Sequence, residues 1–209
     1  EDLSRWSRQT VLPEIGLDGQ KRLLNATIAI VGMGGLGCPA AQSLTIAGVG
    51  KLKIIDGDKV ELSNLHRQPL YGVEDIGRLK VKVAKEKLEK LNGDAVVEIV
   101  DELLNKDNGV TFVSDADIII DATDNIQTRL LIDRLSKESG VPMVYGGLYR
   151  YEGQVAILNV NGSSGTVRSS APDVVCNEIC SIGHLLWGNA CIPDPPAIST
   201  DRHQGDPPT

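Results

Sequence analysis

A glycine-rich turn stands between the apolar run TIAIV and a run of small residues. Its spacing is G-x-G-x-x-G, with Gly32, Gly34 and Gly37 as the three glycines and Gly35 between them. The first glycine allows a tight turn, the second lets backbone amides approach a phosphate, and the third permits close contact between a helix and a strand. The helix amino terminus adds a partial positive charge. Residues 32–37 therefore predict a mononucleotide or dinucleotide site.

Two carboxylates follow the next apolar run, LKII. Asp56 comes directly after this run and Asp58 two residues later. A carboxylate at the end of the second strand is placed to accept hydrogen bonds from ribose hydroxyls, whereas the alternative is a solvated Asp that only ends the strand. Together with the glycine turn, Asp56 would suit a nicotinamide-dependent oxidoreductase as well as an ATP-binding enzyme.

Cations beyond the ribose carboxylate separate these two classes. Arg67 offers a planar fork for phosphate oxygens and Lys80 offers a point charge, although either one alone would suit a solvated surface. A hydride-transfer enzyme needs no second set of cations here, but a triphosphate does. The pair therefore favours ATP.

A second acidic segment, Asp121-Ala-Thr-Asp124-Asn125, follows the apolar run DIII. Mg²⁺ usually takes one or two carboxylates together with phosphate oxygens and waters. The structural alternative is that Asp121 ends the strand while Asp124 caps a helix that begins near Asn125. We favour Asp124 as the Mg²⁺ ligand, because a cap alone does not require two Asp residues flanking Ala-Thr.

The elements that must position these residues are short β-branched runs alternating with helical patterns. Strands are expected at 27–31, 52–55, 96–100, 117–120, 142–145 and 154–159. Helices are expected from 38 to Gly48 or Gly50, from Lys80 to Asn92 with Val81, Ala84, Leu88 and Leu91 on its apolar face, and from about Asn125 to Glu138 with Leu130, Leu131 and Leu135 packed inside. This order predicts an α/β fold: a doubly wound, Rossmann-like, mostly parallel sheet with helices on both faces. Ligands of such sheets bind beyond the carboxyl ends of the strands.

Taken together, the motifs resemble the ubiquitin-activating-type adenylyltransferases, specifically the MoeB/ThiF group. The resemblance runs from Arg5 to about Asn161. It rests on RWSRQ, LDGQKRLL, VGMGGLGCPA, AGVG, DGDKVELSNLHRQ, Lys80, DATDN and YEGQ. It implies ATP-dependent adenylation of the C-terminal glycine of a small ubiquitin-like sulfur-carrier protein ending in Gly-Gly, with release of pyrophosphate, before a sulfurtransferase donor supplies sulfur. The alternative is a non-catalytic or truncated relative that binds nucleotide or the carrier without turnover.

The resemblance also implies roles for individual residues. Arg67 and Lys80 match the cations on the phosphates, and Asp124 matches the Mg²⁺ ligand. Arg8 matches an arginine that reaches into the neighbouring subunit's site, so a homodimer is expected. The expected nucleotide contacts are Gly32, Gly34, Gly35, Gly37, Asp56, Asp58, Ser63, Asn64, Leu65, His66, Arg67, Lys80, Asp124 and Asn125.

The segment 161–209 departs from the family pattern. It holds six of the ten prolines and three of the four cysteines, and it has no long periodic segment. We therefore expect an ATP-binding adenylyltransferase domain at 1–160 and an atypical, partly irregular tail, in a chain that is shortened relative to the family. The family's C-x-x-C pairs are absent, so no Zn²⁺ is expected although four potential ligands are present: Cys176, Cys180, His184 and Cys191. Cys180 is the candidate nucleophile, but no cation stands beside it, which favours a free or buried thiol.

Composition excludes other classes. Lys and Arg number 21 against 28 Asp and Glu, a net charge of −7, which argues against coating nucleic acid or an anionic membrane. No apolar run is long enough to span a bilayer, and the start EDLSRWSRQT is charged, so we expect a soluble, cytoplasmic protein without a membrane or nucleic-acid partner. The pathway served stays open between molybdopterin synthesis, thiamine synthesis and tRNA thiolation.

Overall fold

The computed structural model describes residues 3–149 and 152–160, and within them a six-stranded sheet has the order β3-β2-β1-β4-β5-β6. The strands are β1 (Thr27–Val31), β2 (Lys51–Ile55), β3 (Val96–Val100), β4 (Ile118–Asp121), β5 (Met143–Tyr149) and β6 (Glu152–Leu158). Strands β1 to β5 pair in parallel, and β6 joins β5 in the antiparallel direction. The predicted Rossmann-like, mostly parallel sheet is confirmed.

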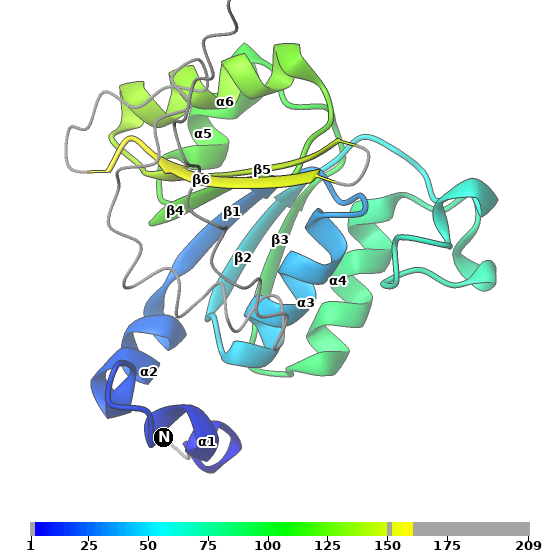
Figure 1. Cartoon of the computed structure of the whole chain (residues 1–209). Coiled ribbons are helices and arrows are strands. Elements are labelled where there is room, and N and C mark those ends of the chain that lie inside the picture. Colours follow the sequence, from blue (N-terminus) through cyan, green and yellow to red (C-terminus); the bar gives the residue numbers. More distant parts are fainter. Residues whose placement is uncertain (1–2, 150–151, 161–209) are drawn as a thin grey trace, which may run out of the picture.

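Helices cover both faces of this sheet. The α-helices are α1 (Ser7–Thr10), α2 (Gly16–Asn25), α3 (Gly37–Ala47), α4 (Lys80–Leu91), α5 (Lys106–Val113) and α6 (Ile126–Ser139), and the 3-10 helices are η1 (Ser4–Trp6), η2 (Leu62–Asn64) and η3 (Val73–Asp75). Figure 1 shows α3 and α4 on one face and α5 and α6 on the other. The sequence patterns did not predict α1, α2 or α5. Among the described helices, none combines the length and the apolar character needed to cross a membrane.

Two apolar cores lie on the two faces of the central strands. Ile28 and Ile30 of β1 belong to the core under α3 and α4, whereas Ala29 and Val31 belong to the core under α5 and α6. Because successive strand side chains point to opposite faces, a strand buried on both faces must be apolar throughout. This is why the central strands are continuous apolar runs in the sequence.

The predicted apolar face of α4 holds over most of its length. Val81, Ala84 and Leu88 are fully buried, and Val83 joins them. The prediction for Leu91 is wrong, because this last residue of the helix is 37% exposed. The buried face of α4 ends one turn before the helix does.

The amino-terminal segment closes the far end of α3. Trp6 Nε1 donates to the Ile46 carbonyl at 2.9 Å, and Gln20 Nε2 donates to the Ala47 carbonyl at 3.0 Å. These bonds satisfy carbonyls that the end of a helix leaves without an intrahelical partner. Gly48 ends the helix at φ +93°, where an added Cβ would lie 2.7 Å from the Trp6 ring. Figure 1 shows α1 and α2 beyond the amino end of β1.

Gly50 gives a test of this packing, because it lies where the start of β2 passes the end of α2. An added Cβ would lie 1.8 Å from the Leu24 carbonyl oxygen, so Gly50→Ala forces a backbone shift. We expect it to lower the free energy of unfolding by about 1–3 kcal/mol, the usual cost of overpacking, as measured by urea titration.

The matched control is Gly93→Ala, where an added Cβ meets nothing within 4 Å. It should change the free energy of unfolding by less than about 0.5 kcal/mol. Equal effects of the two substitutions would contradict the close approach at Gly50.

Candidate nucleotide-binding site

The glycine turn joins the carboxyl end of β1 to the amino terminus of α3. Gly32 has φ +92°, and an added Cβ there would lie 2.9 Å from the Ala122 carbonyl oxygen. At Gly37 an added Cβ would lie 1.9 Å from the Gly32 carbonyl oxygen. The tight turn and the close approach predicted from the spacing are therefore present, and only glycine fits these two positions.

Four successive backbone amides in this turn, of residues 34–37, have no hydrogen-bond acceptor among the residues that the structure describes. They lie at the amino terminus of α3, which carries a partial positive charge. Unpaired amides at a helix amino terminus form a binding site for an anion. The turn can therefore hold a phosphate group.

The Met33 peptide, inside the turn, is bonded from three directions. Its amide donates to Asp56 Oδ2 at 2.7 Å, and its carbonyl accepts from the Tyr71 hydroxyl at 2.9 Å and from Cys38 Sγ at 3.3 Å. Burial raises the pKa of Tyr71 and raises that of Cys38 to about 11, so both remain protonated donors at neutral pH. The turn is fixed in place without a ligand.

Asp56 thus has a structural role that the sequence did not predict. Its second oxygen, Oδ1, accepts from the Asp58 amide at 2.8 Å, and the residue is 9% exposed. Each carboxylate oxygen can accept more than one hydrogen bond. The predicted ribose contact therefore remains compatible with these two bonds and stays a prediction.

The segment 63–68 covers the outer side of the glycine turn. The aliphatic stem of Arg67 lies 3.6 Å from the place that a Cβ on Gly35 would occupy, and Gln68 Nε2 lies 3.7 Å from the equivalent place on Gly34. Arg67 Nη1 donates to the Ser63 carbonyl at 3.1 Å, and the side chain is exposed. No described carboxylate pairs with the guanidinium, which leaves it available to an anion.

Lys80 is the first residue of α4, and its ammonium is held by an ion pair. Its Nζ lies 3.0 Å from Asp58 Oδ2, and its side chain is only 7% exposed. The Lys80 amide also donates to the Asp58 carbonyl at 2.9 Å. Since Asp58 follows Asp56, this pair places a buried cation beside the predicted ribose carboxylate.

The acidic segment after β4 divides into a buried and an exposed carboxylate. Asp121 is completely buried, and its Oδ1 accepts from the Thr123 amide at 3.0 Å and the Thr123 hydroxyl at 2.7 Å. Burial raises the pKa of Asp121. Asp124 is exposed and has no hydrogen bond or ion pair to a described residue. The exposed carboxylate is the one available to a metal.

The cap of α6 is Asn125, so the alternative role for Asp124 as the helix cap is wrong. Asn125 Oδ1 accepts from the amides of Gln127 at 2.8 Å and Thr128 at 3.2 Å, and the helix begins at Ile126. No three described His, Cys, Asp or Glu residues form a metal-binding group. A metal at Asp124 would therefore take its other ligands from the nucleotide and water.

Most predicted site residues lie at the carboxyl end of the sheet, but Arg8 does not. Its helix, α1, directly follows Trp6, which contacts the far end of α3 from the glycine turn. The 11 residues of α3 span roughly 16 Å at 1.5 Å per residue. Arg8 is exposed at the opposite end of the chain's own sheet. The predicted tail, with Cys180 and the other potential Zn²⁺ ligands, lies outside the described residues.

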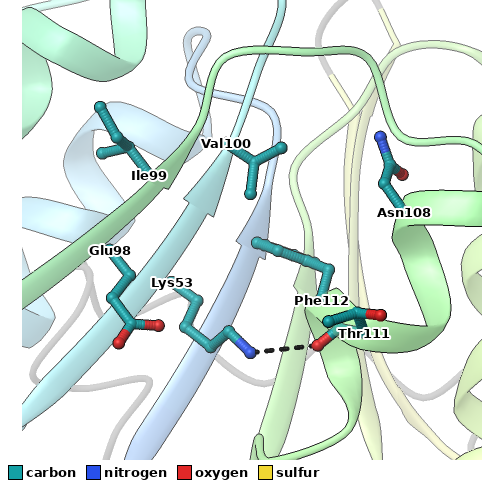
Figure 2. A pocket seen from close by; sticks show the side chains of 7 residues that line it. All are labelled: Lys53, Glu98, Ile99, Val100, Asn108, Thr111 and Phe112. Carbon is teal, nitrogen blue, oxygen red and sulfur yellow. Dashed lines mark hydrogen bonds between the residues drawn. The ribbon is translucent and has the colours of Figure 1, made fainter.

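A pocket of about 290 Å³ lies elsewhere, between β2, β3 and α5 (Figure 2). It is lined by Lys53, Glu98, Ile99, Val100, Asn108, Thr111 and Phe112. Lys53 Nζ donates to the Thr111 carbonyl at 3.4 Å and pairs with Asp115. The ammonium of this pocket is already neutralised, and none of the predicted site residues lines it.

Sequence reasoning missed the residues that hold the site in place, namely Cys38, Tyr71 and Arg129. Arg129 had a readable signal: it stands three residues before Ile132 and six before Leu135, on the apolar face of α6. A charged residue on the apolar face of a helix usually has a specific partner. Tyr71 had no such signal, because its partner, Met33, is 38 residues away.

Comparison with known proteins identifies the family. The model of the ThiF family matches residues 6–186, so the chain belongs to the ThiF family. It is 42% identical over 159 residues to a sulfur carrier protein adenylyltransferase from Thermus thermophilus, which covers 76% of this chain. It is 41% identical over 158 residues to the probable adenylyltransferase/sulfurtransferase MoeZ from Mycobacterium tuberculosis, again covering 76%. The chain spans 59% and 40% of the length of these two relatives.

A solved structure has the same fold. The E. coli tRNA N6-threonylcarbamoyladenosine dehydratase TcdA, in complex with ATP, matches with a TM-score of 0.66 and 27% identity. The match covers 72% of this chain and 64% of that chain. The comparisons thus confirm the fold and the family that the sequence motifs predicted.

The two acidic residues Asp56 and Asp124 should respond differently to neutralisation. Asp56→Asn replaces one carboxylate oxygen by an amide donor, so either the Met33 or the Asp58 amide loses its acceptor. We expect the free energy of unfolding to fall by about 1–3 kcal/mol, the cost of an unsatisfied buried donor. Asp124→Asn should change it by less than about 0.5 kcal/mol, because the side chain is exposed. Urea titration of both variants measures this, and equal losses would contradict the role of Asp56 in holding the turn.

Proposed function

We propose that this protein activates the C-terminal carboxylate of a small ubiquitin-like sulfur-carrier protein with ATP. The carboxylate attacks the α-phosphate, the bond to the β-phosphate oxygen breaks, and pyrophosphate leaves with the electron pair of that bond. The product is an acyl-adenylate ready for sulfur transfer from a sulfurtransferase donor. The observation that carries the proposal is the row of four amides at the α3 amino terminus that have no acceptor among the described residues, with the Arg67 stem against Gly35. Lys80, held by Asp58, adds a second cation.

The fixed glycine turn supports a phosphate-binding role. Four amides, the helix terminus and the exposed Arg67 guanidinium are all donors, and a triphosphate is the polyanion that such a set suits. Asp56 lies beside the turn, where a ribose hydroxyl can donate to it. The bound nucleotide of TcdA, a protein of the same fold, lends further support to ATP as the substrate.

The reaction brings a carboxylate toward a polyanion, so electrostatic repulsion is the main obstacle. Fixed donors oppose this repulsion without reorganising during the reaction, which is the largest contribution in many enzymes. Lys80 is held by Asp58 and stays beside the nucleotide, and Arg67 supplies a second positive charge. We assign both to the transferring phosphate groups.

We assign Asp124 to Mg²⁺. It is an exposed carboxylate with no described partner, on the loop whose Ala122 carbonyl approaches Gly32. Such a donor fits Mg²⁺, which keeps several waters and binds through one or two carboxylates plus phosphate oxygens. When bound, Mg²⁺ neutralises charge on the leaving pyrophosphate. The reaction needs ATP, which is consistent with the cytoplasmic location expected from the sequence.

We assign Arg8 to the site of a second copy of the chain. Within one copy, the length of α3 separates its helix from the glycine turn. An exposed arginine at that distance has no route to its own phosphate site, and a homodimer gives it one. The named activities of the relatives, sulfur carrier protein adenylyltransferase and adenylyltransferase/sulfurtransferase, support the carrier as the partner.

The adenylation step is tested by ATP–pyrophosphate exchange stimulated by a carrier ending in Gly-Gly. Asp124→Ala should reduce the Mg²⁺-dependent exchange rate at least about 100-fold, in the range seen on removing one electrostatic group from an active site, while the urea midpoint stays unchanged. Asp107→Ala is the control, since Asp107 is also an exposed Asp in a helix region. If the wild type catalyses ATP–pyrophosphate exchange and Asp124→Ala does so at the same rate, the role of Asp124 as the Mg²⁺ ligand is contradicted.

Wild-type protein that binds ATP but shows no exchange with any such carrier would favour the non-catalytic alternative. Tight binding of NAD(H) without ATP would instead favour an oxidoreductase.

The trans role of Arg8 is tested by mixing two inactive variants. When Arg8→Ala and Asp124→Ala chains are mixed at equal concentrations and their subunits re-associate, mixed dimers form in which one site keeps both residues. If Arg8 acts across the dimer, about a quarter of the wild-type exchange rate should return, because half of the dimers are mixed and each has one intact site. Activity that does not exceed that of the separate variants would show that Arg8 does not act in trans.

A further inference from the structure

We infer that Arg129 is a positioning residue for the β4–α6 loop, residues 122–125, and that it sets where Asp124 lies. The consequence for Mg²⁺ binding rests on the proposed function. The contact between Arg129 and the loop rests on geometry alone. Arg129 is on α6, one helical turn beyond the loop, and its side chain is 15% exposed.

The guanidinium of Arg129 first fixes the loop itself. Nε donates to the Thr123 carbonyl at 3.2 Å, and Nη2 donates to the same carbonyl. Thr123 in turn donates its amide and hydroxyl to Asp121 Oδ1. The residue directly before Asp124 is therefore held at its carbonyl, amide and side chain.

The same guanidinium also reaches strand β5. Nη1 donates to the Tyr145 hydroxyl at 2.7 Å, and Nη2 donates to the Gly146 carbonyl at 3.1 Å. The guanidinium carbon lies 4.7 Å from the centre of the Tyr145 ring, close enough for a cation–π interaction. One planar group thus joins the loop to the neighbouring strand, which a lysine ammonium could not do with the same geometry.

A buried carboxylate accounts for the charge at this position. Asp121 Oδ2 is buried and has no hydrogen-bond donor among the residues that the structure describes, and it lies 3.8 Å from Arg129 Nε. A buried oxygen of this kind is costly unless a nearby charge compensates it. Asp121 holds Thr123 and is balanced by Arg129, so the three residues form one unit beneath the loop.

The unit also reaches the glycine turn. The Ala122 carbonyl oxygen lies 2.9 Å from the place that a Cβ on Gly32 would occupy, and the Ala122 amide donates to the Val31 carbonyl. The loop that carries Asp124 therefore lies directly against the turn that we assign to phosphate. A shift of this loop would change the distance between Asp124 and a bound nucleotide.

The role of Arg129 is tested by comparing Arg129→Lys and Tyr145→Phe with Arg134→Lys. Arg134 lies on the same helix, is exposed and has no described partner, so its substitution is the matched control. The first readout is amide hydrogen exchange of residues 123–128 in the nucleotide-free protein. Arg129→Lys should speed this exchange by about tenfold through local opening, Tyr145→Phe should have a smaller effect in the same direction, and Arg134→Lys should leave it unchanged.

The second readout is the Mg²⁺ dependence of ATP–pyrophosphate exchange. Arg129→Lys should raise the Mg²⁺ concentration needed for half-maximal rate by about tenfold, as expected for the loss of a charged hydrogen bond, while the rate at saturating Mg²⁺ stays within about twofold of wild type. If Arg129 had only a structural role, its substitution would lower the amount of folded protein and would not raise the Mg²⁺ requirement at an unchanged maximal rate. If Arg129→Lys fails to fold, Tyr145→Phe carries both readouts, because it removes a single hydrogen bond.

The outcomes distinguish the two proposals. Unchanged hydrogen exchange in the loop of both variants overturns the role of Arg129, whether or not the protein binds ATP. Faster hydrogen exchange with an unchanged Mg²⁺ requirement overturns its link to Asp124. The remaining outcome is that Arg129→Lys speeds amide hydrogen exchange while the wild-type protein neither binds ATP nor catalyses ATP–pyrophosphate exchange. This outcome supports the contact and overturns the proposed function instead.

Discussion

The carboxylate of Asp56 is the interaction on which the rest of the site depends. It accepts the Met33 amide of the glycine turn and the Asp58 amide of the next loop, so one side chain joins the carboxyl ends of β1 and β2. Asp58 then holds Lys80 at the start of α4. The turn, the loop and the helix would each have many conformations alone, and the two oxygens of Asp56 couple them. A hydrogen bond to a charged acceptor is stronger than a neutral one, which suits this role.

Burial separates the residues that build the site from those left for a ligand. Asp121 is fully buried and has partners inside the described chain, whereas Asp124 and Arg67 are exposed. Lys80 lies between these groups, since its side chain is buried but its ammonium, which has three N–H donors, bonds one described partner, Asp58. The amides of residues 34–37, which have no acceptor among the described residues, are likewise free for a ligand, although Asp56, Cys38 and Tyr71 bond the neighbouring Met33 backbone. Preorganisation of this kind lowers the entropy lost on binding.

The fold was largely predictable because its information is local. Strands buried on both faces leave continuous apolar runs, and the glycine turn has steric requirements that no other residue meets. Helix α5 escaped prediction because Asn108 and Gly109 interrupt its apolar pattern, and its Asn105 cap is a short-range signal only. The amino-terminal helices escaped because Trp6 and Gln20 bury themselves against the end of α3, a contact between segments far apart in sequence.

The sequence predicts which residues of the candidate site face a ligand, but it does not predict the side chains that hold them in place. Motif spacing predicts Asp56 and Asp124 as ligand contacts, because nucleotide binding favours carboxylates after the ends of parallel strands. Their contacts with a ligand stay predictions. Tyr71, Cys38 and Arg129 act through backbone atoms of Met33 and Thr123, and a backbone acceptor leaves no mark on the sequence. The supports are therefore recognised only when the strands are assembled. In the proposed reaction, a loop displaced by an ångström would lose most of its catalytic benefit, so these backbone contacts would decide whether the motif residues act together.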